Sequence, residues 1–331
     1  MQLMLWLIIA AFAVAVLIGP SIIRWLRSLK FGQSVYDLGP ESHMKKQGTP
    51  IMGGIIFTVP TLLAGIALLI FGKEPDKTLF IMVLVCTFGF GAIGFTDDFI
   101  KMKLHRHEGL TPKQKLLPQI VLSILVSVWA YLSPAVGSAL TVPFFNVEWN
   151  LGIFFIPVMT FILVGTVNSA NLLDGQDGLL SGCAALDFST MAIICYLLSA
   201  QNEGFLSIAA FACALIGGLL GFLIFNGHPA QVFMGDVGAF LIGGALSGIM
   251  LVTRLSLLLP VIALAMLVSS LSDLIQFAYF RATHGKRIFK MAPLHHHFEK
   301  CGYPETRITA AYHIVTALLC ILALIGFLPL N

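Results

Sequence analysis

Residues 79–98 read LFIMVLVCTFGFGAIGFTDD, an uncharged apolar run that ends in two adjacent carboxylates. Such a run can cross a bilayer as a helix, which needs about 20 predominantly apolar residues. A carboxylate at the edge of hydrocarbon is costly and is tolerated mainly where it faces a polar cavity or a cation. The stretch therefore predicts a membrane-spanning helix, 79–96, whose end carries Asp97 and Asp98 into a functional site.

Similar apolar runs occur along the whole chain. Together with 79–96, the expected spans are 3–23, 51–71, 116–136, 151–170, 178–200, 205–225, 237–253, 256–280 and 308–328. Of the 331 residues 58% are hydrophobic and 11% are charged, whereas a soluble domain carries about 25% charge. Because only helices or closed barrels satisfy the backbone in lipid, we expect a single all-α polytopic membrane domain over 1–331 with about ten transmembrane helices.

The basic residues give this arrangement an orientation. All but three of the 19 Lys and Arg residues lie in odd-numbered loops, the exceptions being Lys73, Lys77 and Arg254. The positive-inside rule places the odd loops in the cytoplasm and both termini outside. Residues 139–150 lie in an even loop and alternate apolar with polar side chains, which favours a short external hairpin. The six cysteines form no C-x-x-C pair and are expected to be small buried apolar residues.

Two polar motifs lie in the first odd loops. Lys46 and Thr49 precede a Gly-rich turn, where a lysine can meet a phosphate as a point charge; an ordinary Gly/Pro turn is an equal alternative. Asp97 and Asp98 are followed by Lys101, and adjacent carboxylates repel unless a cation or a shared proton relieves them. The alternative is an ion pair between Asp98 and Lys101 on one helix face.

The next two odd loops carry oxygen ligands. Asn168, Asn171 and Asp174 recur at every third position, a pattern that suits Mg²⁺, although a plain polar turn is the alternative. Asp236 lies in a loop without a basic residue, so a metal is its natural partner. Phe233 either packs at the interface or stacks on a nucleobase.

The last odd loop contains the run His295–His297. Three consecutive histidines cannot all point one way, so they do not suit a zinc site by themselves. Imidazoles that hydrogen-bond a phosphate or pyrophosphate fit better, with Lys286, Arg287 and Lys290 adding positive charge. Attraction to the membrane surface is the alternative for this basic cluster.

The topology thus predicts that the motifs meet at the cytoplasmic surface of the membrane. Such a site suits a phosphate-rich ligand and a divalent cation, because phosphoryl transfer needs mainly positioning and charge neutralisation. Apolar helices around it indicate that one substrate is a lipid. An ion-coupled transporter is the rival class, but no inverted repeat is evident and transporter sites usually lie near the midplane.

The order of the motifs resembles the MraY family of phospho-N-acetylmuramoyl-pentapeptide transferases, within the polyprenyl-phosphate N-acetylhexosamine-1-phosphate transferase superfamily. The matching segments include Gly-Phe-x-Asp-Asp-x-x-Lys, Val-Phe-Met-Gly-Asp and Pro-Leu-His-His-His-Phe-Glu, and they cover nearly the whole chain. The histidine block separates it from relatives that transfer N-acetylglucosamine phosphate, which remain the alternative.

The resemblance implies a ten-span enzyme of the bacterial inner membrane with a cytoplasmic active site. It would transfer phospho-MurNAc-pentapeptide from UDP-MurNAc-pentapeptide to undecaprenyl phosphate, giving lipid I and UMP in peptidoglycan synthesis. Mg²⁺ would be the cofactor, with Asp236 as its leading ligand and Asn171 as a second. Asp98 would activate the lipid phosphate or act as a nucleophile, and Asp97 would support the site electrostatically. Membrane lipid is an expected partner and nucleic acid is not. Whether the protein forms a homodimer is left open.

The resemblance also implies that Asp174 and His295 are catalytic. The expected substrate contacts are Lys46, Thr49, Lys101, Lys113, Asn168, Gly175, Gln176, Asp177, Asn226, Phe233, His296 and His297, of which Gly175, Gln176 and Asp177 would lie near the uridine. Three positions depart from the family pattern, namely Ile51, Gln176 and Ala239. None of them removes a charged group, so they bear on local contacts in the uridine pocket and the loops and not on the reaction.

Overall fold

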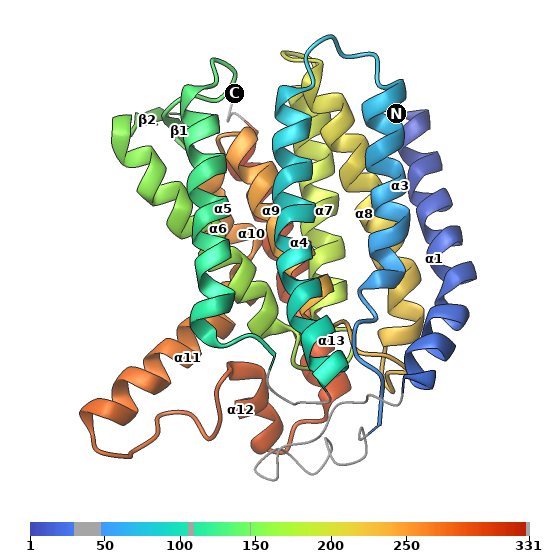
Figure 1. The fold of residues 1–331 in the computed structure, drawn as a ribbon. Helices are drawn as coiled ribbons and strands as arrows, with labels where there is room; N and C mark the ends of the chain where they lie inside the picture. The colour runs from blue at the N-terminus through green and yellow to red at the C-terminus, as the bar shows by residue number, and fades with distance from the viewer. Residues whose placement is uncertain (30–47, 105–108, 146, 329–331) are drawn as a thin grey trace.

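The computed structural model describes residues 1–29, 48–104, 109–145 and 147–328. These residues form a bundle of helices with one small hairpin (Figure 1). In chain order the elements are α1 (Gln2–Ser28), α3 (Ile55–Phe71), α4 (Thr78–Leu104), α5 (Pro112–Leu132), β1 (Ala139–Val142), β2 (Val147–Asn150), η1 (Gly152–Phe154), α6 (Phe155–Leu173), α7 (Leu179–Leu198), α8 (Gly204–Asn226), α9 (Gly235–Val252), η2 (Ser256–Leu258), α10 (Leu259–Ile262), α11 (Leu264–Ala282), α12 (Leu294–Lys300) and α13 (Glu305–Phe327).

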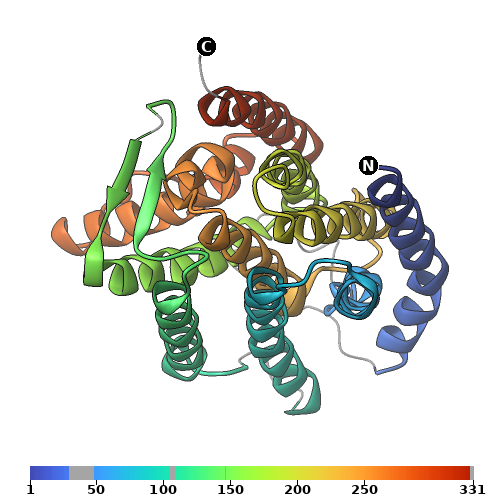
Figure 2. The same cartoon turned by 90° about the horizontal axis from the view of Figure 1, so that it is seen from above.

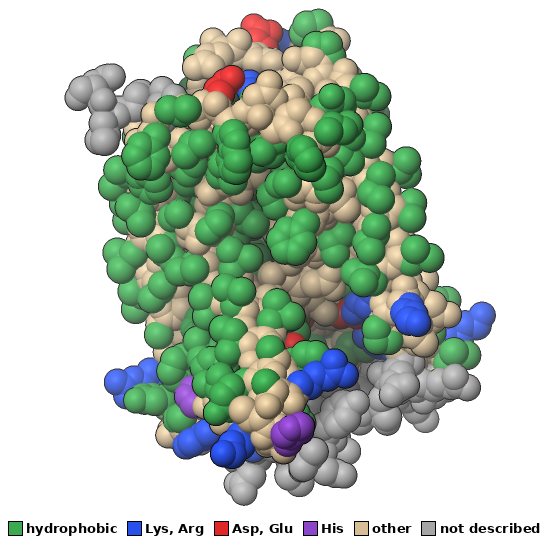
Figure 3. Space-filling view, turned by 90° about the vertical axis from the view of Figure 1, so that its left-hand side faces the viewer, with side chains coloured by type: hydrophobic (Ala, Val, Ile, Leu, Met, Phe, Trp, Pro, Cys, Tyr) green, Lys and Arg blue, Asp and Glu red, His purple; other side chains and the backbone are tan. Residues whose placement is uncertain are grey.

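The helices confirm an all-α polytopic membrane protein. Among the described residues, eight helices are long and apolar enough to cross a membrane, or nine if the bent pair Ser256–Ile262 and Leu264–Ala282 is one span. α3 is a further apolar helix of 17 residues. Figure 3 shows a wide belt of apolar side chains, with the charged side chains of that face gathered toward its two ends. The exact number of spans and the compartment of the termini stay predictions.

α9 lies at the centre of the bundle. Every residue from Asp236 to Val252 is buried, and Figure 2 shows the other helices arranged around it, with α1 and α13 at the periphery. A helix that is apolar on all sides is normally enclosed by protein or lipid. In an 18-residue stretch of each helix, 94% of the residues of α9 are buried but only 22% of those of α1. Protein therefore encloses α9, whereas most of the surface of α1 is left to face lipid.

A glycine lets α4 approach α9 closely. A Cβ atom built on Gly94 would lie 2.2 Å from the carbonyl oxygen of Asp236. Small residues are typical of such contacts in membranes, where close van der Waals packing drives helix association. The contact places the last turns of α4, which carry Asp97 and Asp98, beside the first turn of α9.

The expected span 256–280 is broken in two. Its two helical parts meet at 84°, and α11 leaves the bundle obliquely (Figure 1). The hydroxyl of Ser270 donates to that of Ser169 on α6 (2.7 Å), and the hydroxyl of Ser272 accepts the backbone N–H of Leu294 (2.9 Å). Since these polar groups find partners in protein and not in lipid, the helix turns aside instead of continuing straight through the bilayer.

The expected hairpin is present at 139–150. β1 and β2 pair antiparallel, with Ala139 opposite Asn150, and the guanidinium of Arg254 lies 3.1 Å from the carboxylate of Glu148 on β2. The hairpin sits at the end of the bundle where α1 begins, opposite α12 (Figure 1). All six cysteines are free, and the five other than Cys301 are buried, which confirms the expected packing role for those five; Cys301 is exposed.

We predict that Gly94→Ala destabilises the protein by about 1–3 kcal/mol, as overpacking typically does, because the new methyl group meets the backbone of α9. The measurement is the unfolding midpoint of the purified protein in detergent. Gly165→Ala in α6 is the matched control, because nothing lies within 4 Å of a Cβ at that position and alanine favours helix. Equal midpoints for the two variants would contradict a tight α4–α9 contact at Gly94.

Candidate active site

Three carboxylates meet where α4 ends and α9 begins. Asp97 and Asp98 come from the last turns of α4, and Asp236 lies in the first turn of α9. One oxygen from each of the three lies within 4.8 Å of the others, and all three residues are buried. Sequence reasoning expected these acids to meet, and the structure brings them together. Such a group of oxygen atoms is of the kind that holds a hard divalent cation.

Two lysines offset part of the negative charge of this acid cluster of Asp97, Asp98 and Asp236. The ammonium of Lys101 lies 2.6 Å from Asp97 Oδ2 and 2.8 Å from Asp236 Oδ2, but 3.5 Å from Asp98 Oδ1. The ammonium of Lys115 lies 2.7 Å from Asp236 Oδ2. Lys101 therefore links α4 to α9. Its contacts go beyond the single Asp98–Lys101 ion pair that the spacing allowed.

Lys115 is a site residue that the sequence analysis missed. Lys113, which was expected to contact substrate, is exposed on α5, and no contact between it and the acid cluster is found among the described residues. The sequence alone does not distinguish Lys115 from Lys113, whereas the packing of α5 does. Gln119, one helical turn further along α5, is buried and its side-chain oxygen accepts a hydrogen bond from Asn168 at 2.6 Å, so this face of α5 points into the protein.

Backbone amides fix the carboxylates of α4. The N–H of Val237 donates to Asp98 Oδ2 at 3.0 Å, and the N–H of Leu110 donates to Asp97 Oδ1 at 2.7 Å. Each aspartate thus has one oxygen held by the backbone and the other turned toward Lys101. Hydrogen bonds to an ionised carboxylate stabilise the charged form and lock its orientation.

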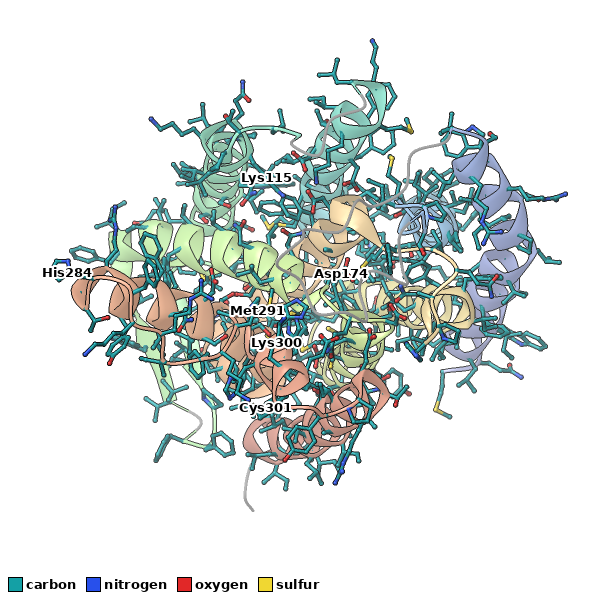
Figure 4. All side chains as sticks on the ribbon, turned by 90° about the horizontal axis from the view of Figure 1, so that it is seen from below. Lys115, Asp174, His284, Met291, Lys300 and Cys301 are labelled. Carbon is teal, nitrogen blue, oxygen red and sulfur yellow. The ribbon has the colours of Figure 1, made fainter. Side chains whose placement is uncertain are left out.

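α6 adds Asn171 and Asp174 to the same place. The side-chain amide of Asn171 donates to Asp236 Oδ1 at 2.6 Å. Asp174 directly follows α6, and it receives a hydrogen bond from the backbone of Gly235. Burial, and then the negative charges of Asp236 and Asp98, raise the pKa of Asp174 to about 8. In Figure 4 Asp174 lies near the middle of the lower end of the bundle, with Lys115 to one side.

Residues 50–54 and 232–234 pair beside the acid cluster. The N–H of Phe233 donates to the carbonyl of Pro50 (2.9 Å), and the N–H of Gly53 donates to the carbonyl of Phe233 (2.8 Å). Gly235 follows with φ of 76°, where a Cβ would lie 2.6 Å from Asp98 Oδ2. The glycine is therefore required where the chain enters α9. Thr49 is half-buried next to this pairing, whereas Lys46 lies outside the described residues.

The three histidines of α12 divide between two directions, as expected. His295 and His296 are buried and face the loop after α6, where a Cβ on Gly175 would lie 2.2 Å from His295 Nε2 and 3.1 Å from His296 Nε2. His297 instead accepts the backbone N–H of Lys290 at 3.0 Å. The structure therefore brings two of the three histidines against the loop after α6 and turns His297 toward Lys290.

Two further residues that were expected to contact substrate, Asn226 and Gln176, form hydrogen bonds with other protein groups. The side chain of Asn226 accepts from the N–H of Gly178 (3.2 Å) and donates to the carbonyl of Val232 (3.1 Å). The amide of Gln176 lies 3.4 Å from Glu299 of α12. Both side chains are buried, so they hold the loops around the site in place.

Asp177 belongs to a second polar cluster that sequence reasoning did not foresee. Asp177 Oδ2 accepts the N–H of Ala230 at 3.0 Å and lies 3.0 Å from His228 Nδ1. The N–H of Asp177 donates to Glu305 at 2.6 Å. Asp177, His228 and Glu305 also have the spacing of metal ligands. Glu305 lies in the first turn of α13, 128 residues along the chain from Asp177, so the sequence gives no signal for this pairing.

Comparison with known proteins identifies sequence relatives of this chain. The sequence model described as Glycosyl transferase family 4 matches residues 80–254. A Clostridioides difficile protein is 43% identical over 96% of this chain and 95% of its own length. A Bacillus pumilus protein is 42% identical over 98% of this chain and 97% of its own length. Both relatives carry the name phospho-N-acetylmuramoyl-pentapeptide-transferase.

We predict that Asp174 makes the stability of the metal-free protein depend on pH. Its pKa is about 8 in the folded state and about 3.9 in an unfolded chain, so the folded state retains a proton that the unfolded state has lost. The free energy of unfolding should therefore fall as pH rises from about 4 to 8, and should then level off.

The measurement is the unfolding midpoint in a chelator between about pH 5 and 9, compared with Asp174→Asn, in which this slope should be shallower. Asp76→Asn is the control. Asp76 is exposed and its hydrogen bonds to Thr78 hold its pKa below the usual value, so its removal should leave the slope of the wild type unchanged. An identical slope in Asp174→Asn would show that another group titrates.

Proposed function

The chain belongs to the phospho-N-acetylmuramoyl-pentapeptide transferases, within glycosyl transferase family 4, and on this premise we propose that its acid cluster catalyses phosphoryl transfer to a lipid. The substrates would be UDP-MurNAc-pentapeptide and undecaprenyl phosphate, and the products lipid I and UMP. The observation that carries the proposal is the meeting of Asp97, Asp98 and Asp236 with Lys101 and Lys115 at the end of the apolar bundle.

The acid cluster fits Mg²⁺. Three buried carboxylates offer oxygen atoms within 4.8 Å of one another, and Mg²⁺ binds through a few carboxylates while it keeps waters and takes substrate phosphates as further ligands. Asp236 would be the leading ligand, and Asn171 beside it a second. When bound, the ion would neutralise charge on the diphosphate and on the leaving UMP.

Asp98 is the group best placed to act on the lipid phosphate. Its Oδ2 is held by the backbone of α9, while Oδ1 remains turned toward Lys101. In a direct transfer, Asp98 accepts a proton from the lipid phosphate. A phosphate oxygen of the lipid then bonds to the sugar-linked phosphorus of the nucleotide as the bond to UMP breaks.

The direct route is favoured over a covalent one by charge. Asp97 and Asp236 crowd the carboxylate of Asp98, and an anionic diphosphate is a poor electrophile for a carboxylate in such surroundings. Lys101 and Lys115 lie beside Asp236 and can neutralise both the carboxylates and the phosphates. The contribution of the protein is thus mainly electrostatic, as is usual for phosphoryl transfer.

The nucleotide would lie along the loop after α6. Gly175 has no side chain, so His295 and His296 can pack close against the backbone of this loop, and their ring nitrogens suit a pyrophosphate. Phe233 offers an aromatic face, since it is only half-buried next to this loop. Asp177 is held in position by His228 and Glu305. Asn226 and Gln176 would support this pocket from behind.

The lipid would reach the acid cluster from the bilayer. The cluster lies at the end of a belt of apolar side chains, and Figure 3 shows acidic and basic side chains in a recess at the lower edge of that belt. The basic residues of the odd-numbered loops favour the cytoplasmic side. We therefore place this multi-pass enzyme in the bacterial inner membrane with its site toward the cytoplasm.

The test is UMP release by the purified protein with undecaprenyl phosphate and Mg²⁺. We expect release with UDP-MurNAc-pentapeptide and little with UDP-N-acetylglucosamine, the substrate of the alternative branch. Asp98→Asn is the control and should retain less than a tenth of the rate, an increase of at least about 1.4 kcal/mol in the barrier. Equal use of both nucleotides, or an active Asp98→Asn enzyme, would contradict the proposal.

Lys115 and Lys113 provide a matched pair for the site itself. Lys115→Gln should lower kcat by tenfold or more, about 1.4 kcal/mol, because it removes an ammonium that lies 2.7 Å from Asp236. Lys113→Gln removes the same charge from the exposed face of the same helix and should lower kcat much less. The measurement is kcat at saturating substrates and Mg²⁺. A larger loss in the Lys113 variant would reverse this assignment.

A further inference from the structure

The hairpin β1–β2, at the end of the bundle opposite the acid cluster (Figure 1), has one apolar face. Leu140 pairs with Trp149, and Val142 pairs with Val147. Side chains directly opposite each other in an antiparallel pair point to the same side, and alternate residues of a strand share a face. These four apolar side chains therefore form one face of the hairpin, and Glu148 lies on the other.

The bundle covers β1 but not β2. Leu140 is fully buried, whereas Trp149, its partner across the pair, is 57% exposed. β1 is also tied to the bundle, because the N–H of Thr141 donates to the carbonyl of Arg254 (2.9 Å) and the guanidinium of Arg254 donates to the carbonyl of Ala139 (3.0 Å). In Figure 1 β2 lies beyond β1 at the edge of the bundle. The apolar face thus begins on the protein and continues past it.

The uncovered part of this face continues the lipid-facing surface of the bundle. β2 leads directly into η1 and α6, whose Phe154 and Phe161 are exposed. Val147 of β2 is exposed as well. The charge of the hairpin lies on the opposite face, where the carboxylate of Glu148 pairs with Arg254. An exposed apolar surface that adjoins the membrane belt and bears no charged side chain suits contact with lipid.

The tryptophans of α1 indicate the level at which the hairpin lies. Trp6 and Trp25 are both exposed on this helix and are 19 residues apart. At 1.5 Å per residue this separation is about 28 Å, close to the thickness of roughly 30 Å of the hydrocarbon in a bilayer. Tryptophan is enriched at both membrane–water interfaces, so Trp6 marks one of them. α1 begins at the same end of the bundle as the hairpin (Figure 1), which places Trp149 near the same interface.

A second copy of the chain is the competing occupant of this surface. Among the described residues the sheet has two strands only, so β2 is an edge strand, and such an edge can pair with another strand. Pairing of that kind uses the backbone groups along the edge and leaves the face of the strand uncovered. It does not explain why the exposed face is apolar and continuous with α6. Contact with lipid explains both features.

We propose that the apolar face of β2 binds the surface of the bilayer, with Val147 and Trp149 at the boundary between the head groups and the acyl chains. The hairpin is then a membrane anchor and not a loop in water. Because it joins α5 to α6, it fixes the depth at which these two helices enter the bilayer. The inference goes beyond the catalysed reaction and does not depend on it.

The test is the quenching of tryptophan fluorescence by brominated lipid. The full-length protein is reconstituted in phosphatidylcholine vesicles that contain dibromo-phosphatidylcholine, brominated either near the head group or near the end of the acyl chain. The signal of Trp149 is the difference between the wild type and Trp149→Phe. We expect the shallow bromines to quench this signal at least about twofold more than the deep ones, because an interfacial side chain lies closer to them.

Phe161→Trp, made in the Trp149→Phe protein, is the matched control. Phe161 is exposed on α6 and lies further into the membrane than the hairpin. The deep bromines should therefore quench its tryptophan more strongly than they quench Trp149. Trp149→Phe keeps an aromatic ring at an exposed position and should unfold at the midpoint of the wild type. Trp149→Tyr gives a second, independent difference signal.

Three outcomes would overturn the proposal. If aqueous iodide quenched Trp149 and neither lipid did, the hairpin would lie in water. If iodide and both lipids left it unquenched, protein would cover it, as a second copy would. If the deep bromines quenched it as strongly as the shallow ones, the hairpin would not lie at the boundary of the bilayer.

Discussion

The structure depends on holding three like charges together in a buried place. Two unit charges 4 Å apart repel by about 4 kcal/mol at the effective dielectric of a protein surface, and oxygens of Asp97, Asp98 and Asp236 lie within 4.8 Å of one another. The close packing of α4 on α9 at Gly94 leaves these side chains no freedom to separate. Cations must therefore compensate the charge. Lys101 and a second lysine from α5 do so here, and the surrounding loops are arranged around that requirement.

Much of this arrangement could be predicted because its causes are local or topological. An uncharged run such as 79–96 has few stable conformations in lipid other than a helix, and the alternation in 139–150 favoured the hairpin that is present. The meeting of Asp98 with Asp236 followed from counting spans, since all odd-numbered loops emerge on the same side of the membrane. The split orientation of His295 and His297 followed from the geometry of consecutive residues.

The remainder could not be predicted because it is set by tertiary contacts. Lys113 and Lys115 are the same residue type two positions apart, so they point to opposite sides of a helix, and only the packing of α5 decides which one reaches Asp236. The run 256–280 has the length and composition of a straight span, yet serine contacts with α6 and α12 turn α11 aside. The pairing of Asp177 with Glu305 joins elements far apart in sequence, which spacing cannot reveal.

The two lysines also connect the binding of metal to the binding of substrate. A divalent cation that joins Asp236 competes with the ammonium groups of Lys101 and Lys115, which lie within 2.8 Å of the same oxygen. An ammonium group displaced from a buried carboxylate loses its compensation and requires another anion. The diphosphate of the nucleotide is such an anion, and it also supplies ligands to the metal. Metal and nucleotide each relieve a charge that the other leaves unpaired, so the site is best neutralised when both are bound.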